Sequence, residues 1–582
     1  YFELDQENKN LLWKGNSYFT GLNAFFKKIE AKNYKIQNRV LLSRYRGKTH
    51  CDSCQGARLK PEAAYVKVNG KSLSELVNEP LDDLLAFFNT ITLSPQQQEV
   101  ADRLLIEIKS RLNFIKDVGL GYLTLNRKSN SLSGGESQRI NLATSLGSSL
   151  VGSMYILDEP SIGLHSRDNE RLIKILKKLR DLGNTVLVVE HDEEIMQAAD
   201  CIIDMGPEAG TLGGAVVAQG TMATILKSSS LTAQYLRGQL KIEVPPIRRT
   251  NKEQIIVVGA RENNLKNITA HFPLNSMTVV TGVSGSGKST LVKKILYPAL
   301  QRELDIFVEK PGQFTKLDGN YSSIKHVEFI DQNPIGRSSR SNPVTYIKAY
   351  DDIRAQLSKM RNYQAKHFSF NVDGGRCEAC KGEGTVTIEM QFMADVVLLC
   401  EHCKGRRFKK EVREVKFEGK SIDDILGLTV DDAIAFFEEH AQAKLVKKLL
   451  PLQKVGLGYV SLGQSSATLS GGEAQRIKLA SFIGKGDHRD KILFIFDEPT
   501  TGLHFHDIKK LLTSFEALLE KGHSLIVVEH NIDLIKCADH VIDLGPEGGN
   551  KGGTVLGEGT PEALSKIKGS FTGAYLRKKL KS

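Results

Sequence analysis

Residues 282–290 read GVSGSGKST and directly follow a short apolar run at residues 277–281. The periodicity of residues 291–300 is that of a helix, so this part of the chain predicts a strand, a glycine-rich loop and a helix in succession. Glycines allow backbone N–H groups to close around phosphates, and the N-terminus of the following helix adds positive potential. We expect Lys288 to reach the β- and γ-phosphates of a bound nucleotide and Ser289 to ligate Mg²⁺. The predicted phosphate-binding loop of this α/β domain comprises Gly282, Ser284, Gly285, Gly287, Lys288, Ser289 and Thr290.

Three other motifs occur twice in the chain and in the same order. LSGGE stands at residues 132–136 and 469–473, Asp-Glu-Pro follows each copy, and a Glu-His pair comes later in both. The phosphate-binding loop, in contrast, occurs once in the sequence. The chain is therefore an internal duplication in which only the second half carries that loop.

The duplication predicts the domain organisation. Residues 1–240 form the C-terminal part of a first domain, residues 241–252 a linker, and residues 253–582 a complete second domain with an insert at about 366–415. The linker contains Pro-Pro and Arg-Arg pairs that interrupt the periodic pattern. Because the first residue is Tyr1 rather than Met, we expect the chain to begin inside a longer protein.

Each Asp-Glu pair follows an apolar run that predicts a buried strand, at residues 153–157 and at residues 491–496. An Asp at the end of such a strand can hold Mg²⁺ through water, and the adjoining Glu can polarise the attacking water. The alternative, that each pair merely caps a helix, is disfavoured because both pairs stand between LSGGE and Glu-His. The candidates are Asp158 and Glu159 in the first half and Asp497 and Glu498 in the second.

Six of the eight cysteines form three Cys-x-x-Cys pairs. Two pairs, within residues 377–403, have the spacing of a four-thiolate site suited to tetrahedral Zn²⁺. The third pair, Cys51 and Cys54, aligns with the last two of these cysteines and has no earlier cysteine partner, so we expect half a zinc site with free thiols. Cys201 and Cys537 are expected to be small buried hydrophobic residues. The predicted zinc ligands are Cys377, Cys380, Cys400 and Cys403.

The net charge of the 582 residues is +11, which favours a polyanionic partner such as nucleic acid. Many basic proteins bind no anion, so the charge alone is a weak signal. No run approaches the ~18 apolar residues of a membrane span, and no signal peptide is visible. We therefore expect a cytoplasmic protein without a membrane span.

The repeated motifs resemble the signature, Walker B and switch-histidine motifs of ATP-binding-cassette ATPases. In that family ATP lies between two domains, with the phosphate-binding loop of one facing the signature of the other. DQNPIGRSSRSNP at residues 331–343 and GGRCEAC at 374–380 narrow the resemblance to the UvrA family, the damage-recognition ATPases of bacterial nucleotide excision repair. IGLH at residues 162–165 and TGLH at 501–504 also indicate the UvrA family, because transporters of the ATP-binding-cassette family usually have a different loop at these positions. The resemblance covers nearly the whole chain and implies tandem cassette domains with helical signature subdomains and an inserted zinc module.

The head-to-tail pairing of that family implies one complete ATP site, between the second-half loop and the first-half signature. The catalytic residues it implies are Glu498, His530 and Gln332, and the further binding residues are Asp497, Ser133, Gly134, Gly135 and Glu136. The second site lacks a phosphate-binding loop, and its residues are Asp158, Glu159, His191, Ser470, Gly471 and Gly472. We therefore expect at most one ATP per chain.

The insert between the loop and the second signature carries basic residues interleaved with Phe368, Phe370 and Phe408. Such residues could contact DNA phosphates while a zinc hairpin positions them. The alternative is a solvated basic face balanced by nearby glutamates. The candidate DNA contacts are Arg376, Lys404, Arg406 and Arg407.

The resemblance implies an ATP hydrolase without nuclease chemistry that uses ATP, Mg²⁺ and Zn²⁺. It also implies a homodimer that binds double-stranded DNA, prefers damaged duplex, and loads UvrB in the full-length protein. Two alternatives stay open: a UvrA-like paralogue with a role in drug resistance, and a transporter or translation-factor ATPase of another class. The zinc insert and the two Gly-Leu-His segments disfavour the second of these.

Overall fold

The computed structural model describes residues 4–46, 51–54, 56–132, 134–147, 151–306, 309–336, 338, 340–360, 363–388, 390, 396–484 and 490–581. The chain divides into two compact units. The first contains Tyr1–Glu79 and Ile91–Leu93, and the second contains Pro80–Thr90 and Ser94–Ser582. This division differs from the repeat boundaries expected at residues 240 and 253, which stay a prediction. Most of the first half of the duplication lies in the same unit as the whole second half.

The first unit consists of short helices and one small hairpin. Gly15 and Gly21 have positive φ angles of 79° and 73° at the turn between its first two helices, and a Cβ on Gly15 would lie 2.2 Å from the carbonyl oxygen of Phe19. This turn therefore requires glycine. Its elements are α1 (Gln6–Lys14), α2 (Gly21–Glu30), α3 (Ile36–Tyr45), the 3-10 turn η1 (Pro61–Tyr65), β1 (Lys67–Val68), β2 (Lys71–Ser72) and α4 (Leu73–Asn78).

The second unit is built around a six-stranded sheet. Its order is β11 (His326–Ile330), β16 (Ile492–Asp497), β17 (Ser524–Val528), β9 (Met277–Gly282), β18 (His540–Gly545) and β19 (Thr554–Gly559). All neighbours are parallel except β19, which is antiparallel to β18. The strands β9, β16 and β17 are almost continuously buried, which explains their uninterrupted apolar sequences. The α/β fold class expected from the sequence is confirmed.

The strand, loop and helix expected around residues 277–300 are present. The π-helix η4 (Thr290–Leu296) continues directly into α12 (Tyr297–Glu303). These helices pack on one face of the large sheet beside a three-stranded antiparallel sheet, β10 (Lys316–Gly319), β7 (Gln254–Ala260) and β8 (Ile268–Pro273). Val280 on β9 and Leu291 and Ile295 on η4 belong to the apolar cluster between them. This packing fixes the loop between β9 and η4 at the carboxyl edge of the sheet.

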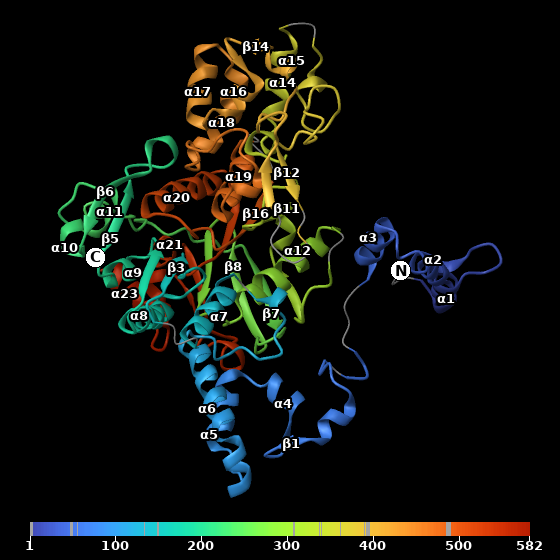
Figure 1. Ribbon diagram of the computed structural model, residues 1–582, viewed down its shortest axis with the longest axis vertical. Coiled ribbons are helices and arrows are strands. Elements are labelled where there is room, and N and C mark those ends of the chain that lie inside the picture. The colour runs from blue at the N-terminus through green and yellow to red at the C-terminus, as the bar shows by residue number, and fades with distance from the viewer. Residues whose placement is uncertain are drawn as a thin grey trace. The chain divides into compact units, whose positions relative to one another are not determined.

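The other face of the sheet packs against helices of the second half. The helical part of the second half lies at one end of the second unit, and α5 and α6 of the first half lie at the opposite end (Figure 1). The α-helices and strands between β11 and α19 are α13 (Pro343–Tyr346), α14 (Tyr350–Ser358), β12 (Thr385–Ile388), β13 (Val396–Leu399), α15 (Lys410–Arg413), β14 (Lys416–Phe417), β15 (Lys420–Ser421), α16 (Ile422–Gly427), α17 (Val430–Glu439) and α18 (Ala443–Lys454). They are followed by α19 (Gly471–Ile483), α20 (Phe505–Glu520), α21 (Ile532–Ile535), α22 (Pro561–Leu564) and α23 (Phe571–Lys579).

The part of the first half within the second unit repeats several of these elements. It contains α5 (Leu81–Thr90), α6 (Pro95–Asp117), α7 (Gly134–Gly147), β3 (Met154–Asp158), α8 (Ser166–Asp181), β4 (Thr185–Val189), α9 (Glu193–Ala198), β5 (Ile202–Gly206), β6 (Ala215–Gly220), α10 (Met222–Ile225) and α11 (Leu231–Leu236). The parallel pair β3–β4 corresponds to β16–β17. The antiparallel pair β5–β6 corresponds to β18–β19 and has an irregularity at the same position. The duplication is therefore structural as well as sequential.

The two halves differ in how their strands are covered. Within the described residues β3–β4 and β5–β6 form separate two-stranded sheets, whereas β9 joins their counterparts in the second half. Large apolar side chains of β3, β4 and β5 are consequently exposed, among them Met154, Ile156, Val189 and Met205. Cys201, immediately before β5, is also exposed, so the expectation that it is buried was wrong, while Cys537 is buried as expected.

No helix in the described part of the chain is both long and apolar enough to pass through a bilayer.

The two halves allow a matched test of this difference in burial. Ile495 on β16 is fully buried, and its counterpart Ile156 on β3 is 65% exposed. We expect Ile495→Ala to lower the free energy of unfolding by roughly 2–5 kcal/mol, because it leaves a cavity in the core. Ile156→Ala should change it by less than about 0.5 kcal/mol. Urea unfolding monitored by circular dichroism measures both, and equal losses would contradict the assigned burial.

Candidate nucleotide site and zinc cluster

The phosphate-binding loop is a tight cradle closed by a buried lysine. Gly282 has a φ of +133°, and a Cβ there would lie 2.0 Å from the carbonyl oxygen of Leu544, so only glycine fits. The Lys288 ammonium donates to the carbonyls of Gly282 (3.0 Å) and Val283 (3.1 Å). Burial lowers the pKa of Lys288 to about 8, although Glu498 and other nearby carboxylates act in the opposite direction. A cation in a glycine cradle beside a helix start fits a phosphate group.

The acidic pair lies beside this cradle, where β16 ends. Asp497 is the last residue of β16, and Glu498 has a φ of +47°, a left-handed conformation that is uncommon for a residue with a side chain. The Glu498 N–H donates to the carbonyl of Val528 (2.9 Å), which holds this conformation. Burial, together with repulsion from Asp497 and Glu529, raises the pKa of Glu498 to about 7. Such a carboxylate can act as a base near neutral pH.

His530 and Gln332 both approach Glu498. The Nε2 atom of His530 lies 3.7 Å from a carboxylate oxygen of Glu498. Burial lowers the pKa of His530 well below its usual range, so the imidazole is neutral. The Gln332 amide donates to the backbone carbonyl of Glu498 (3.1 Å) and to the Thr501 hydroxyl (3.0 Å). The three side chains expected to be catalytic are thus grouped, while their roles stay predictions.

The first half completes this site from across the interface between the halves. The P-loop hydroxyl of Ser284 donates to the carbonyl of Gly163 (3.2 Å). A Cβ on Gly163 would lie 3.3 Å from a carboxylate oxygen of Glu498. The segment of residues 161–165 therefore touches both the phosphate-binding loop and the acidic pair of the second half. The contact joins opposite halves, as a head-to-tail pairing would, and the nucleotide site that it would complete stays a prediction.

The first-half signature joins the same site through Tyr122. The Tyr122 hydroxyl donates to Glu136 (2.6 Å), and a Cβ on Gly285 would lie 2.8 Å from the Tyr122 ring. Gly134 and Gly135 begin α7, whereas Ser133 lies outside the described residues. The sequence reasoning missed Tyr122. Its signal was the repeated Gly-Leu-Gly-Tyr, which precedes both signatures and ends at Tyr122 and Tyr459.

The glutamate of each Glu-His pair was also not among the predicted site residues. The Glu529 carboxylate accepts from the N–H groups of Thr500 (3.0 Å) and Asn531 (2.9 Å). Glu190 likewise accepts from the N–H groups of Ser161 (2.8 Å) and His191 (3.0 Å). Each glutamate therefore ties the loop after an Asp-Glu-Pro motif to the turn that holds the switch histidine.

The other composite site repeats half of this geometry. Glu159 has a φ of +46°, and the Nε2 atom of His191 lies 4.0 Å from its carboxylate. A Cβ on Gly502 would lie 2.9 Å from a carboxylate oxygen of Glu159. This corresponds to the 3.3 Å between a Cβ on Gly163 and Glu498. Asp158 ends β3. In the second signature, Ser470 caps α19, and Gly471 and Gly472 begin that helix. Within the described residues of the first half, no phosphate-binding loop stands beside these groups.

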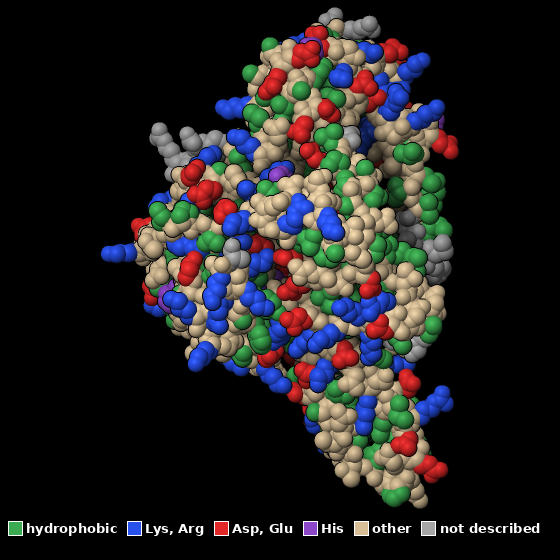
Figure 2. Space-filling view, turned by 90° about the vertical axis from the view of Figure 1, so that its left-hand side faces the viewer, with side chains coloured by type: hydrophobic (Ala, Val, Ile, Leu, Met, Phe, Trp, Pro, Cys, Tyr) green, Lys and Arg blue, Asp and Glu red, His purple; other side chains and the backbone are tan. Residues whose placement is uncertain are grey.

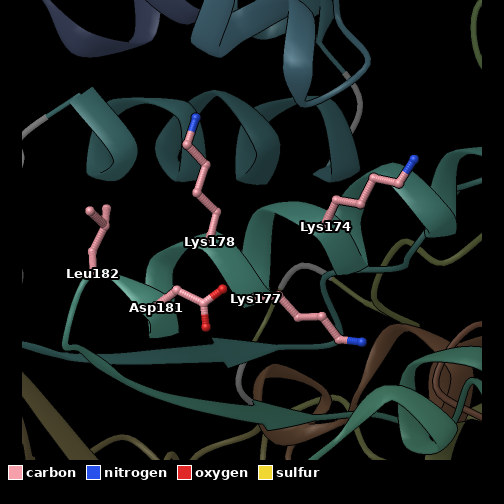
Figure 3. Close-up of a pocket in the computed structure, with 5 residues that line it drawn as sticks. All are labelled: Lys174, Lys177, Lys178, Asp181 and Leu182. Carbon is pink, nitrogen blue, oxygen red and sulfur yellow. The ribbon is translucent and has the colours of Figure 1, made fainter.

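A hollow on the surface of α8 lies outside this machinery. Lys174 and Lys178 point to one side of the helix and Lys177 to the other (Figure 3). Asp181 and Leu182 complete its lining. The face of the molecule in Figure 2 carries Lys and Arg side chains interspersed with Asp and Glu. The basic net charge is therefore not gathered into one patch on this face.

Four buried thiols come together in the insert, as expected from their spacing. The ligand atoms of these four cysteines all lie within 4.8 Å of one another, and they form the only such group of three or more within the part of the chain that the structure describes. Tetrahedral zinc–thiolate bonds of about 2.3 Å place sulfurs roughly 3.8 Å apart. The observed distances are 3.9 Å between Cys377 and Cys400 and 3.6 Å between Cys380 and Cys403. The Gly384 N–H donates to the Cys380 sulfur (3.3 Å). The donor set and spacing therefore fit Zn²⁺.

The remaining pair, Cys51 and Cys54, lies in the first unit. Cys51 is exposed and Cys54 is half-buried. Hydrogen bonds from Cys54 and from the Ser53 backbone lower the pKa of the Cys51 thiol. The pair belongs to no group of three or more metal-ligating side chains among the described residues. The expectation of free thiols stays a prediction.

The candidate DNA contacts differ in their accessibility. Arg376 is only 15% exposed and is bound to Asp373, and the Arg407 guanidinium lies over the Phe370 ring. Phe368, Phe370 and Phe408 are core residues, so the phenylalanines themselves are not exposed to a DNA partner, while the phosphate contacts of the basic side chains stay a prediction. Phe370 stacks on Tyr350 of α14, with ring centroids 4.9 Å apart, and also meets Phe408. Lys404 and Arg406 are exposed, although Arg406 lies 3.7 Å from Asp423, and their exposure makes them the better candidates for phosphate contacts.

Comparison with known proteins gives consistent matches. A family model described as ABC transporter matches residues 265–501. The UvrABC system protein A of Clostridium perfringens is 52% identical over 546 residues, which cover 93% of this chain and 58% of that protein. That of Staphylococcus epidermidis is 52% identical over 546 residues, covering 93% and 57%. The crystal structure of UvrA2 from Deinococcus radiodurans matches with a TM-score of 0.88 at 36% identity, covering 100% of this chain and 75% of that one. The chain spans less than two thirds of the length of these two curated relatives.

The cysteine cluster predicts the zinc content of the protein. We expect the purified chain to contain about one zinc per molecule, and Cys403→Ser to reduce this to well below ~0.5, because three thiolates hold zinc less tightly than four. Mass spectrometry of the metal content measures both. Cys537→Ser, at a buried cysteine outside the cluster, is the control and should keep its zinc. Two zinc ions per wild-type chain would mean that Cys51 and Cys54 also bind metal.

Proposed function

The chain belongs to the UvrA family of ATP-binding-cassette proteins, and on this premise we propose that it hydrolyses ATP at one composite site to control its binding to DNA. The observation that carries the proposal is the contact across the halves, in which the Gly163 segment meets both Ser284 and Glu498. This contact brings the loop, acidic pair and switch histidine of one half against the signature side of the other.

Each side chain of the composite site has its own role in phosphoryl transfer. Lys288 binds the β- and γ-phosphates, and the loop N–H groups orient them. Ser289 and Asp497 would hold Mg²⁺, which neutralises phosphate charge when bound. The Glu498 carboxylate orients the attacking water and accepts its proton, while neutral His530 and the Gln332 amide hold the surroundings of Glu498 in place.

We propose double-stranded DNA as the partner, with a preference for damaged duplex, and nucleotide excision repair as the setting. Family membership and the net charge of +11 support this proposal. The zinc module, held by Cys377, Cys380, Cys400 and Cys403, would present Lys404 and Arg406 to the DNA backbone. Homodimerisation, cytoplasmic location and loading of UvrB by the longer protein belong to the same proposal.

Replacing the general base should separate ATP binding from hydrolysis. We expect Glu498→Gln to lower kcat for ATP hydrolysis by about 100-fold or more, because the amide cannot accept a proton. Titration calorimetry of this variant should still give one ATP per chain. The matched control is Glu159→Gln at the equivalent position of the incomplete site, for which we expect a change of less than ~3-fold. Two bound ATP per chain, or equal losses in both variants, would contradict the single-site proposal.

The rate of hydrolysis should also depend on pH. Because the pKa of Glu498 is raised to about 7, the carboxylate is largely protonated at pH 6 and ionised at pH 8. The ionised form is the active one, so kcat should rise with pH through about 7. A rate that falls over this interval would show that Glu498 is not the base.

Lys404 and Arg406 should contribute to DNA affinity. We expect the double variant Lys404→Glu, Arg406→Glu to bind duplex DNA more weakly and to lower the slope of log affinity against log salt by about 2, since two phosphate contacts are lost. The control, Lys174→Glu with Lys177→Glu on α8, makes the same change in net charge elsewhere. Fluorescence anisotropy at several salt concentrations measures both. Equal losses in the two variants would mean that only net charge matters.

A further inference from the structure

The histidines of the repeated Gly-Leu-His motif, His165 and His504, have no part in the proposed chemistry so far, and neither has the repeated Asp-x-Gly-Pro motif, which begins at Asp204 and Asp543. The structure connects each Gly-Leu-His to the Asp-x-Gly-Pro of the opposite half through a threonine. His165 is fully buried, and its Nε2 atom lies 3.0 Å from the hydroxyl of Thr572 on α23. The Thr572 hydroxyl donates to Asp543 on β18 (3.2 Å). We name this set of three residues the His165 bridge.

The hydrogen bonds of the His165 bridge have a defined direction. The Asp543 carboxylate accepts from the hydroxyls of Thr572 and Ser570, so the Thr572 oxygen is left to accept from His165. The other ring nitrogen of His165, Nδ1, accepts from the backbone N–H of Arg167 (3.2 Å). Both ring nitrogens are therefore used, and the ring is neutral with its proton on Nε2. Burial lowers the pKa of His165 to about 3, and Lys288 and Arg167 act in the same direction.

The His165 bridge ends beside the phosphate-binding loop. Asp543 pairs with Thr281 in the parallel register of β18 and β9, and Thr281 directly precedes Gly282. Its other end is fixed to residues 161–165, whose Gly163 carbonyl accepts from Ser284 and whose backbone lies beside Glu498. The ring of His165 also meets that of His530 edge to face, with centroids 6.3 Å apart. The bridge thus anchors the first-half segment to the strand that carries the loop.

The duplication supplies a second bridge with the same parts. The Nε2 atom of His504 lies 3.3 Å from the Thr232 hydroxyl, which donates to Asp204 (2.9 Å). The Nδ1 atom of His504 accepts from the N–H of His506 (3.3 Å). We name this set the His504 bridge. It also joins opposite halves, but it holds Gly502 beside Glu159 at the incomplete site.

We propose that His165 is a positioning residue for ATP hydrolysis, which holds the first-half loop against Glu498 and the phosphate-binding loop through Thr572 and Asp543. This inference rests on the proposed function. The His504 bridge has the same bonds without a phosphate-binding loop beside it, so it contributes to packing of the halves and not to turnover. A shift of ~1 Å between reacting groups can cost about 100-fold in rate, so loss of the His165 anchor should act on kcat.

The test compares matched variants of the two bridges in the 582-residue chain. His165→Phe keeps a ring but removes both hydrogen bonds, and His504→Phe does the same in the other bridge. We expect His165→Phe to lower kcat by about 10- to 100-fold while KM for ATP changes less than ~3-fold, because ATP contacts are retained. His504→Phe should change kcat by less than ~2-fold. His165→Gln, whose amide can still donate to Thr572, should restore much of the rate.

A second pair of variants distinguishes a specific effect on turnover from a folding defect. Thr572→Val removes the hydroxyl at nearly constant shape and should lower kcat as His165→Phe does, whereas Thr232→Val should not. Melting temperatures of all variants show whether they fold. Equal losses of kcat in the two bridges, or a loss in His165→Phe carried entirely by KM, would overturn the positioning role while leaving the proposed ATPase intact. A wild-type chain that binds ATP without turnover would instead overturn the proposed function, and this inference with it.

Discussion

The hydrogen bonding of β9 to two parallel neighbours is the constraint on which the site depends. β17 pairs with one edge of β9 and β18 with the other, so the loop after β9 emerges between the ends of both strands. Asp497, at the end of β16, and His530, after β17, are thereby brought to the same edge of the sheet as Lys288. The carboxyl edge of a parallel sheet brings together residues that are distant in sequence, because each stands at the end of its own strand.

The proposed nucleotide site also requires contact between the two halves of the chain. Neither half contains all the groups of the composite site, since the signature side comes from residues before 170 and the loop and acidic pair from residues after 280. Contacts such as Arg167 with Glu547 (3.0 Å) and Tyr575 with Glu170 (3.1 Å) hold them together. The same sequence motif consequently has two environments. His530 is 7% exposed beside the complete site, and its counterpart His191 is 38% exposed.

The parts of the fold that the sequence predicted are those defined over short distances along the chain. The strand, loop and helix around Lys288 and the cysteine spacing needed only local pattern and elementary chemistry. The placement of Glu498, by contrast, needed the repeat and a family resemblance. Tyr122 and Glu529 were missed because their partners lie in other elements. The repeated Gly-Leu-Gly-Tyr and Glu-His motifs contain these residues, but neither pattern says what the side chain contacts. Cys201 was misjudged for a related reason: burial depends on what packs over a strand, and the first-half strands are covered less than their second-half counterparts.

The separate small sheets of the first half bear on how the chain behaves in solution. In the described residues β4 and β5 each have one edge without a strand partner, and their neighbourhood exposes Ile156, Val189 and Met205. Unpaired apolar edges favour contact between molecules, and the net charge of +11 opposes it by mutual repulsion. Salt screens that repulsion over a Debye length of about 10 Å at 0.1 M, without weakening apolar contacts. The colloidal stability of this chain therefore depends on ionic strength, and concentrated solutions are best kept at low salt.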